Sequence, residues 1–167
     1  MMAVRPVLVL PHRVLSAVAA SVERVDDRAR ALAEDLLDTM RASPACVGLA
    51  APQIGVSLRA FVVDVTGHRK ARSCHGPLVL FDPVITASHE PEVAREGCMS
   101  VPDLTGDVAR ARSLSVVGAG IDGERVTLEV DAFEARAVQH ELDHLDGLLF
   151  LDRVAGSHAL FERKVYR

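Results

Sequence analysis

The chain has 167 residues, of which 49% are hydrophobic and 25% are charged, and its formal net charge is −4. This length fits a single domain with one substantial core, and the composition is ordinary for a soluble globular protein. The acidic balance excludes an overall basic surface of the kind that binds nucleic acid, and no apolar run approaches the length of a membrane span. We therefore expect one domain over residues 1–167, with no DNA and no membrane partner. A short basic end, formed by Arg163, Lys164 and Arg167, is expected to be a solvated tail.

The three cysteines, Cys46, Cys74 and Cys98, are an odd number in a chain that is not rich in disulfide-forming residues. Thiols that are used individually indicate a reducing compartment. The apolar run at residues 7–10 is broken by Pro11 and is shorter than the core of a signal peptide requires. We therefore expect a cytoplasmic protein, and a monomer because no association helix is obvious.

The first expected helix follows an extended and irregular segment over residues 4–25. Asp26 or Asp27 can cap its start, and Ser43-Pro44 ends it. Its apolar residues repeat at helical spacing: Ala29, Leu32, Ala33, Leu36, Leu37 and Met40.

Small and apolar residues fill the next stretch, residues 47–55, apart from Gln53. This stretch is either a buried turn or a strand that lines a site with Gln53 pointing into it, because small residues let a ligand approach the backbone closely. Strands are then expected at residues 58–65, 78–81 and 126–130. The second should break at Asp82-Pro83, and Asp122-Gly123 predicts a hairpin turn before the third.

The last expected helix begins at Asp131, which resembles a capping box together with Glu134 three residues later. Gly147 is placed to close this helix. The sequence thus predicts an α+β fold in a single domain. Mixed or antiparallel strands would pack around the central C-terminal helix, with a second helix near the N-terminus.

The C-terminal helix carries the pattern His-Glu-x-x-His at His140, Glu141 and His144. Residues four apart lie on the same face of a helix, so two imidazoles can bind one metal ion. The carboxylate of Glu141 can reach a water on that metal. The alternative is a surface helix that carries two histidines without a metal. Because catalytic sites of this type usually take three protein ligands, a third ligand must come from elsewhere.

Cys98 is the strongest candidate for the third ligand, because the tight turn around it, formed by Gly97 and a Ser-Val-Pro stop, can project a thiolate. One thiolate with two imidazoles suits Zn²⁺ or Fe²⁺. In the alternative interpretation Cys98 is a small buried hydrophobic residue. Cys46 competes for the role of ligand on chemistry alone.

Three blocks of the sequence stand out together: Gly-Leu-Ala-Ala-Pro-Gln at residues 48–53, Glu-Gly-Cys-Met-Ser at 96–100 and Gln-His-Glu-Leu-Asp-His at 139–144. These blocks resemble the three signature motifs of peptide deformylases. They occur in the order of that family, and the resemblance extends from Pro11 to Asp152. It implies an enzyme that removes the N-formyl group from the N-terminal formyl-methionine of newly synthesised proteins and releases formate.

The resemblance implies that Cys98, His140 and His144 bind one divalent metal ion. Fe²⁺ is expected first, with Zn²⁺, Ni²⁺ and Co²⁺ as alternatives. Glu141 would act as general base and general acid. The substrate partner would be the formyl-methionine end of a nascent polypeptide, with transient ribosome contact as a further expectation.

The resemblance also implies that Gln53 and the backbone amide of Met99 bind the developing oxyanion. Gly48 and Leu49 would line the substrate channel. Charge and resemblance together suggest that Glu96 and Arg110 form an ion pair that holds the cysteine turn. The alternative is that Arg110 is a solvated surface arginine.

Several positions depart from the family's pattern, including Asp82-Pro83 in place of the more usual Asn-Pro, and two of them concern the substrate. Cys46 stands where the family usually has glycine, and Thr105 stands where an arginine often contacts the substrate backbone, so peptide anchoring should be weaker. The remaining alternatives are a metallo-amidase or peptidase with another substrate, a non-catalytic relative that binds formyl-peptides, and a thiol hydrolase built on Cys98 and His140.

Overall fold

The computed structural model describes residues 3–164. Its α-helices are α1 (Asp27–Arg41) and α2 (Ala132–Leu145). Its strands are β1 (Gly48–Ala50), β2 (Ala60–Val63), β3 (Leu78–Cys98), β4 (Val101–Ala119), β5 (Arg125–Asp131) and β6 (Leu160–Glu162). Four short 3₁₀-helices are η1 (Arg13–Ser16), η2 (Ala51–Ile54), η3 (Phe150–Asp152) and η4 (Ser157–Ala159). None of the helices within residues 3–164 has the length and apolar character needed to cross a membrane.

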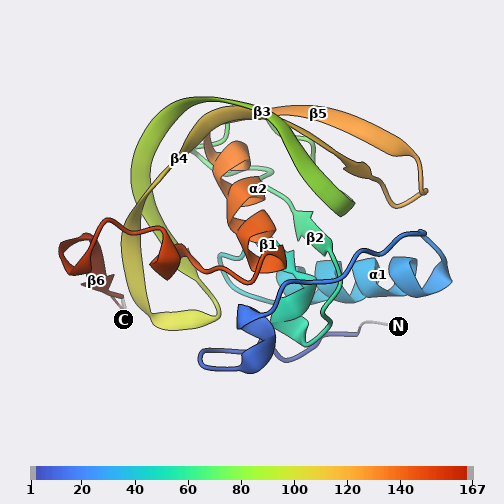
Figure 1. Ribbon diagram of the computed structural model, residues 1–167, viewed down its shortest axis with the longest axis horizontal. Coiled ribbons are helices and arrows are strands. Elements are labelled where there is room, and N and C mark those ends of the chain that lie inside the picture. Colours follow the sequence, from blue (N-terminus) through green and yellow to red (C-terminus); the bar gives the residue numbers. More distant parts are fainter. Residues whose placement is uncertain (1–2, 165–167) are drawn as a thin grey trace.

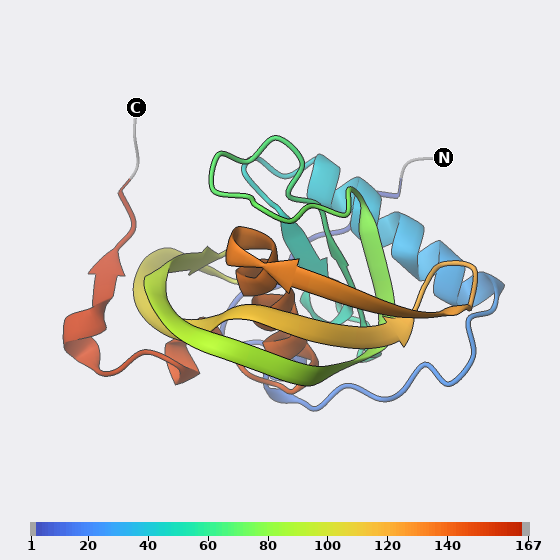
Figure 2. The same cartoon turned by 90° about the horizontal axis from the view of Figure 1, so that it is seen from above.

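The six strands form one antiparallel sheet in the order β1-β2-β3-β4-β5, and β6 pairs with β4. Figure 1 shows the long β3–β4 hairpin and β5 arching around α2, which occupies the centre of the molecule. In the view from above, α1 lies on the side of the sheet that carries β1 and β2 (Figure 2). The predicted α+β fold, with antiparallel strands around a central C-terminal helix, is confirmed.

Helix α1 follows its sequence pattern closely. Asp26 is the N-cap, and its carboxylate accepts a hydrogen bond from the backbone N–H of Ala29 at 3.0 Å. This bond satisfies one of the donors that a helix start leaves unpaired. The apolar face of α1, including Leu36, packs against Leu49 of β1 and Val62 of β2 in one buried cluster. The helix thereby fixes the position of β1, which borders the site described below.

The start of helix α2 is fixed by hydrogen bonds from the loop that contains Ser73 and His75, which the sequence did not predict. Asp131 is the N-cap residue, but its carboxylate accepts from the backbone N–H of Ser73 at 2.8 Å and makes no cap bond within the helix. The fully buried Glu134 accepts from the Ser73 hydroxyl and from the His75 backbone N–H. The predicted capping box is therefore wrong, because a loop distant in sequence supplies the donors. Gly147, with φ of 74°, follows the end of the helix as predicted.

The predicted end of strand β3 at Asp82-Pro83 is wrong. The strand continues to Cys98 through a shift in pairing between Phe81 and Val84, which is a β-bulge. Asp82 has φ of 49°, and its carboxylate accepts from the backbone N–H groups of Val22 and Glu23. A bulge tolerates proline because one residue leaves the ladder of hydrogen bonds. The strand can therefore continue and bring Cys98 to the C-terminal half of α2, beside His144.

Candidate metal centre

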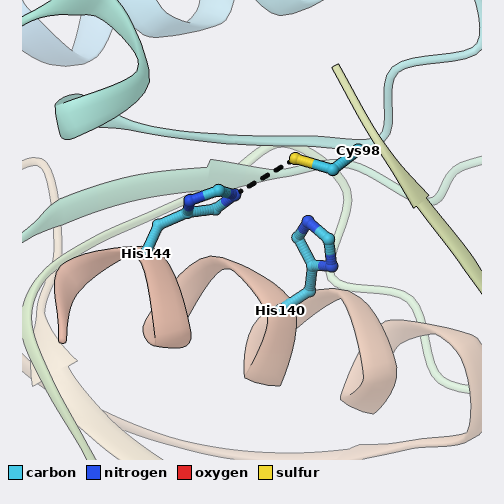
Figure 3. A group of neighbouring side chains, drawn as sticks. All are labelled: Cys98, His140 and His144. Carbon is cyan, nitrogen blue, oxygen red and sulfur yellow. Dashed lines mark hydrogen bonds between the residues drawn. The ribbon is translucent and has the colours of Figure 1, made fainter. Parts of the chain in front are cut away.

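Three potential metal ligands converge at the end of β3 and along one face of α2. Cys98 is the last residue of β3, and His140 and His144 lie one helical turn apart. Their ligand atoms all lie within 4.8 Å of one another, and Cys98 Sγ is 3.4 Å from His144 Nε2 (Figure 3). Cys98 and His144 are almost completely buried. The structure thus brings together the three residues that the sequence analysis selected; their binding of a metal stays a prediction.

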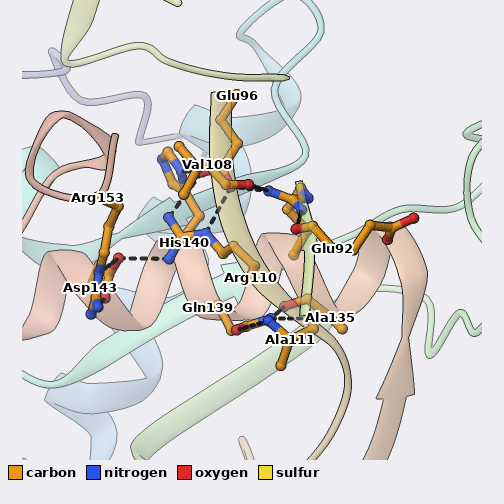
Figure 4. Close-up of polar contacts among 11 residues, drawn as sticks. Glu92, Glu96, Val108, Arg110, Ala111, Ala135, Gln139, His140, Asp143 and Arg153 are labelled. Atoms are coloured by element: carbon orange, nitrogen blue, oxygen red, sulfur yellow. Dashed lines mark hydrogen bonds and ion pairs between the residues drawn. The ribbon is translucent and has the colours of Figure 1, made fainter. Parts of the chain in front are cut away.

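The carboxylate of Glu96 fixes the geometry of this cluster. It accepts hydrogen bonds from Arg110 Nε at 2.7 Å and Nη2 at 2.9 Å, from Arg136 Nη1 at 2.7 Å and from His140 Nδ1 at 2.9 Å (Figure 4). Burial alone would raise the pKa of Glu96, but the hydrogen bonds from His140 and Arg110 outweigh it and hold the pKa well below its usual range. The ion pair predicted between Glu96 and Arg110 is confirmed.

Because Glu96 is ionised, it is the acceptor of its bond with His140. Nδ1 of His140 therefore donates to Glu96, so Nε2 is the ring nitrogen left to bind a metal when the imidazole is neutral. A buried carboxylate that selects the tautomer of an imidazole in this way is a common support of metal ligands.

The network extends beyond the residues that the sequence indicated. Asp143, next to His144, accepts from Arg110 Nη1 at 2.7 Å and from Arg153 Nη2 at 2.9 Å. Arg136 also donates to the carbonyl oxygen of Val108 at 2.9 Å. The available signal was the spacing of Arg136, four residues before His140 on the same helical face. Its buried partner could not be recognised from sequence alone.

Glu141 lies beside the cluster, with only 4% of its surface exposed. Its Oε2 has no hydrogen-bond partner among residues 3–164, which is unusual for a buried polar atom. Burial raises the pKa of the Glu141 carboxyl to about 7, against the opposing effect of His140 and Arg110. A methyl group added to Gly48 would lie 2.7 Å from Glu141 Oε1, so the glycine provides the space that this carboxylate occupies.

Gln53 is fixed from both ends of its amide. Its Oε1 accepts from the backbone N–H of Ala50 at 3.0 Å, while its Nε2 donates to Ser100 Oγ at 3.1 Å and lies 3.6 Å from Cys98 Sγ. The stretch around Gln53 proves to be both a short strand, β1, and a buried turn, η2. The side-chain N–H₂ group of Gln53 faces the cluster of predicted ligands, in agreement with the interpretation that Gln53 points into a polar site.

The two remaining site predictions have different surroundings. Met99 begins the turn between β3 and β4 and lines the cavity. Leu49 is fully buried, with its side chain in the cluster between α1 and the sheet. Any contact between Leu49 and a ligand would thus involve its main chain.

Cys46 and Cys74 lie outside the ligand cluster. Burial, with a smaller effect from Glu141, raises the pKa of the Cys46 thiol to about 11, and its Sγ lies 3.1 Å from the carbonyl oxygen of Gly48, to which the S–H donates. A protonated thiol is a poor metal ligand at neutral pH. Cys74 is exposed, as an incidental surface thiol should be.

One cavity of about 440 Å³ opens onto the cluster. Its walls include Gly48, Gln53, Cys98, Met99, His140 and Glu141. Arg163 and Lys164 line the same cavity and are both exposed to solvent, which agrees with the expectation of a solvated end. Arg167 lies outside the described residues.

The donor set fits a divalent metal of borderline softness, since a thiol sulfur and two imidazole nitrogens converge next to a buried carboxylate oxygen that lacks a partner within the described chain. A His-Glu-x-x-His helix with a third ligand from a separate turn defines the class of single-metal hydrolases.

Comparison with known proteins gives the family. The model of the polypeptide deformylase family matches residues 4–159. The peptide deformylase of Desulforudis audaxviator is 42% identical over 164 residues, which cover 98% of this chain and 99% of the relative. The crystal structure of the Thermotoga maritima peptide deformylase has a TM-score of 0.83 and 35% identity, covering 92% of this chain and 99% of that chain. The crystal structure of the Acinetobacter baumannii peptide deformylase bound to Met-Ala-Ser has a TM-score of 0.83 and 34% identity, covering 92% and 100%. The chain belongs to the polypeptide deformylase family.

The network around Glu96 yields a test of stability and metal binding. Arg110→Ala removes the partner that Glu96 and Asp143 share, and it should lower the free energy of unfolding by about 3–5 kcal/mol because two buried carboxylates lose a cation. The bound metal per chain should also fall, since the acceptor that orients His140 is no longer fixed. Chemical denaturation and elemental analysis measure both effects.

Arg112→Ala is the matched control, because Arg112 lies exposed on the same strand. It should change stability by less than about 0.5 kcal/mol and leave the metal content unaltered. Equal behaviour of the two variants would contradict the role assigned to Arg110.

Proposed function

We propose that this chain is a peptide deformylase that hydrolyses the N-formyl group of formyl-methionine at the start of newly synthesised polypeptides and releases formate. One observation carries the proposal: Cys98, His140 and His144 converge beside the buried carboxylate of Glu141, and Cys98, His140 and Glu141 line one cavity. The relative from Acinetobacter baumannii binds Met-Ala-Ser, which is the peptide that remains when formate leaves formyl-Met-Ala-Ser.

In this proposal Cys98, His140 and His144 hold one divalent ion. Fe²⁺ is the first choice, with Zn²⁺, Ni²⁺ and Co²⁺ as alternatives, because one thiolate and two imidazoles suit all of these metals. When bound, the metal supplies a Lewis acid that polarises the formyl group and activates water. Glu96 keeps the His140 ring in the required orientation and tautomer.

Glu141 moves the proton. Its carboxylate accepts a proton from the attacking water and delivers it to the nitrogen of the departing amine. Support comes from its position, buried next to His140 and adjoining Gly48 at the cavity wall. Its Oε2, which has no partner within residues 3–164, can accept a hydrogen bond from that water.

Gln53 and Met99 stabilise the negative charge that develops on the formyl oxygen. The donors are Gln53 Nε2 and the backbone N–H of Met99, and donors fixed before the reaction lower its barrier most effectively. The bond from Ala50 to Gln53 Oε1 fixes the direction of Nε2 in advance. Gly48 borders the substrate directly, and Leu49 contributes through its main chain.

The cellular setting follows from the substrate and the thiol ligand. We assign the enzyme to the cytoplasm, where nascent chains emerge and where Cys98 stays reduced. We further propose that it acts as a monomer with transient ribosome contact, and that residues 1–167 work as one catalytic domain. Support for the domain is the match of residues 4–159 to one family model.

The proposal predicts formate release from formyl-Met-Ala-Ser by protein loaded anaerobically with Fe²⁺. Glu141→Gln should lower kcat by about 10²–10⁴-fold, since general acid–base catalysis contributes an effect of this size. Its metal content should equal that of the wild type, because Glu141 is not a ligand. Removal of the metal with a chelator should abolish activity, and added Fe²⁺ should restore it.

Glu124→Gln, at an exposed position in the β4–β5 turn, is the control and should keep full activity. Activity that survives chelation would indicate a thiol hydrolase and contradict the proposal. A folded, metal-loaded protein that releases no formate would also contradict it, and other amides and unformylated peptides would then be assayed as substrates.

Gly48 provides a second test of the same site. Gly48→Ala should displace the Glu141 carboxylate, because the new methyl group would lie 2.7 Å from Oε1. We expect kcat to fall by about 10²-fold, the effect of misplacing a catalytic group by roughly 1 Å, while metal content is retained. Gly120→Ala is the control, since the nearest atom to its methyl group would be Oδ1 of the flexible Asp122 side chain, at 3.3 Å, and the other neighbours would lie at 3.8 Å and 3.9 Å, which is ordinary van der Waals contact. A fully active Gly48→Ala variant would refute this placement of Glu141.

A further inference from the structure

The C-terminal segment carries a cation into the cavity from the far end of the chain. Strand β6 pairs with β4 so that Phe161 is opposite Thr105, and the backbone N–H of Arg163 donates to the Asp103 carbonyl oxygen at 2.9 Å. The guanidinium of Arg95 lies over the ring of Phe161, with 3.6 Å between the Arg95 Cζ atom and the centre of the ring. The main chain of the segment is therefore fixed up to Arg163, beside the β3–β4 hairpin (Figure 1).

Arg163 is exposed to solvent and lines one corner of the cavity. Its Nη2 donates to the carbonyl oxygen of Cys98 at 3.3 Å. A methyl group added to Gly97 would lie 2.6 Å from Arg163 Nη2 and 3.5 Å from Thr105 Cγ2. Arg163 and Thr105 thus meet over the side of Gly97 that lacks a Cβ atom, directly beside the turn that supplies Cys98.

Arg163 differs from the other arginines of the cavity wall in its partners. Arg95 pairs with Asp107 at 2.7 Å, and Arg136 is held by Glu96. Within residues 3–164, the bond to Cys98 is the one side-chain hydrogen bond of Arg163, and it forms no ion pair there. A guanidinium has five N–H donors in a planar fork that matches carbonyl and carboxylate oxygens. Most of that fork is available to a ligand in the cavity.

We infer that Arg163 anchors the part of the peptide that follows the formyl-methionine, by donating to its backbone carbonyl oxygens or to the terminal carboxylate of a short peptide. This inference rests on the proposed function. One cavity extends from Glu141 and His140 to Thr105 and Arg163, so a peptide whose formyl group meets Glu141 can continue towards Arg163. The anchoring charge that Thr105 cannot supply comes instead from the segment after β6.

The test compares substrates that do and do not reach Arg163. Arg163→Ala should raise KM for formyl-Met-Ala-Ser by about tenfold, the effect of losing one hydrogen bond to a charged group, with kcat within twofold of the wild type. The kcat/KM for formyl-methionine amide, which ends before the corner, should not change. Thr105→Arg in the Arg163→Ala background should restore the low KM, because both side chains occupy the same corner. Arg125→Ala, at an exposed position at the start of β5, is the control and should match the wild type.

Equilibrium binding separates this inference from the proposed function. Calorimetry with Met-Ala-Ser needs no turnover, and Arg163→Ala should weaken binding by about tenfold. An equal loss with Met-Ala-Ser amide identifies backbone carbonyls as the acceptors, whereas a loss confined to the free acid identifies the carboxylate. If Arg163→Ala affects long and short substrates alike, or neither, the inference is wrong. Binding that depends on Arg163 in a protein that releases no formate would refute the proposed function alone.

Discussion

The site depends on the buried carboxylate of Glu96, which lies where the long hairpin meets helix α2. It belongs to β3 and accepts hydrogen bonds from Arg110 of β4 and from Arg136 and His140 of α2. Withdrawing a carboxylate from water is costly unless its acceptor sites are filled. Here they are filled by groups from β4 and α2, so Glu96 fixes the mutual positions of β3, β4 and α2. One of the three donors is a predicted metal ligand, and another predicted ligand, Cys98, lies two residues from Glu96 along the strand.

This arrangement explains how a long hairpin and a helix can hold a small cluster with defined geometry. Two of the predicted ligand positions, His140 and His144, are fixed by the turn of the helix itself, but the position of Cys98 depends on how β3 curves around α2. The bulge at Asp82 and the network at Glu96 control that curvature from its two ends. Space is controlled separately, since the absence of a side chain at Gly48 lets the Glu141 carboxylate lie against β1. The fold therefore supplies both position and room for the reacting groups.

Features that depend on local spacing could be predicted from the sequence. The apolar face of α1 and the placement of His140 and His144 on one face of α2 follow from 3.6 residues per helical turn. Three blocks of residues were enough to identify the family. Features that depend on distant partners could not be predicted. The sequence predicts that Glu134 caps its own helix, but its carboxylate oxygens accept hydrogen bonds from a loop some sixty residues earlier in the chain. Likewise, no local pattern reveals that β6 pairs with β4 and brings Arg163 to the cavity.

The identity of the sulfur ligand is the central structural claim, because two thiols lie near the helix that supplies the imidazoles. X-ray absorption spectroscopy of the Zn²⁺-loaded protein tests it directly. The account predicts one sulfur at about 2.3 Å from the metal and nitrogen ligands at about 2.0–2.1 Å. The sulfur signal should disappear in Cys98→Ser and persist in Cys46→Ser. A wild-type spectrum without sulfur, or a sulfur signal lost only in Cys46→Ser, would contradict the account.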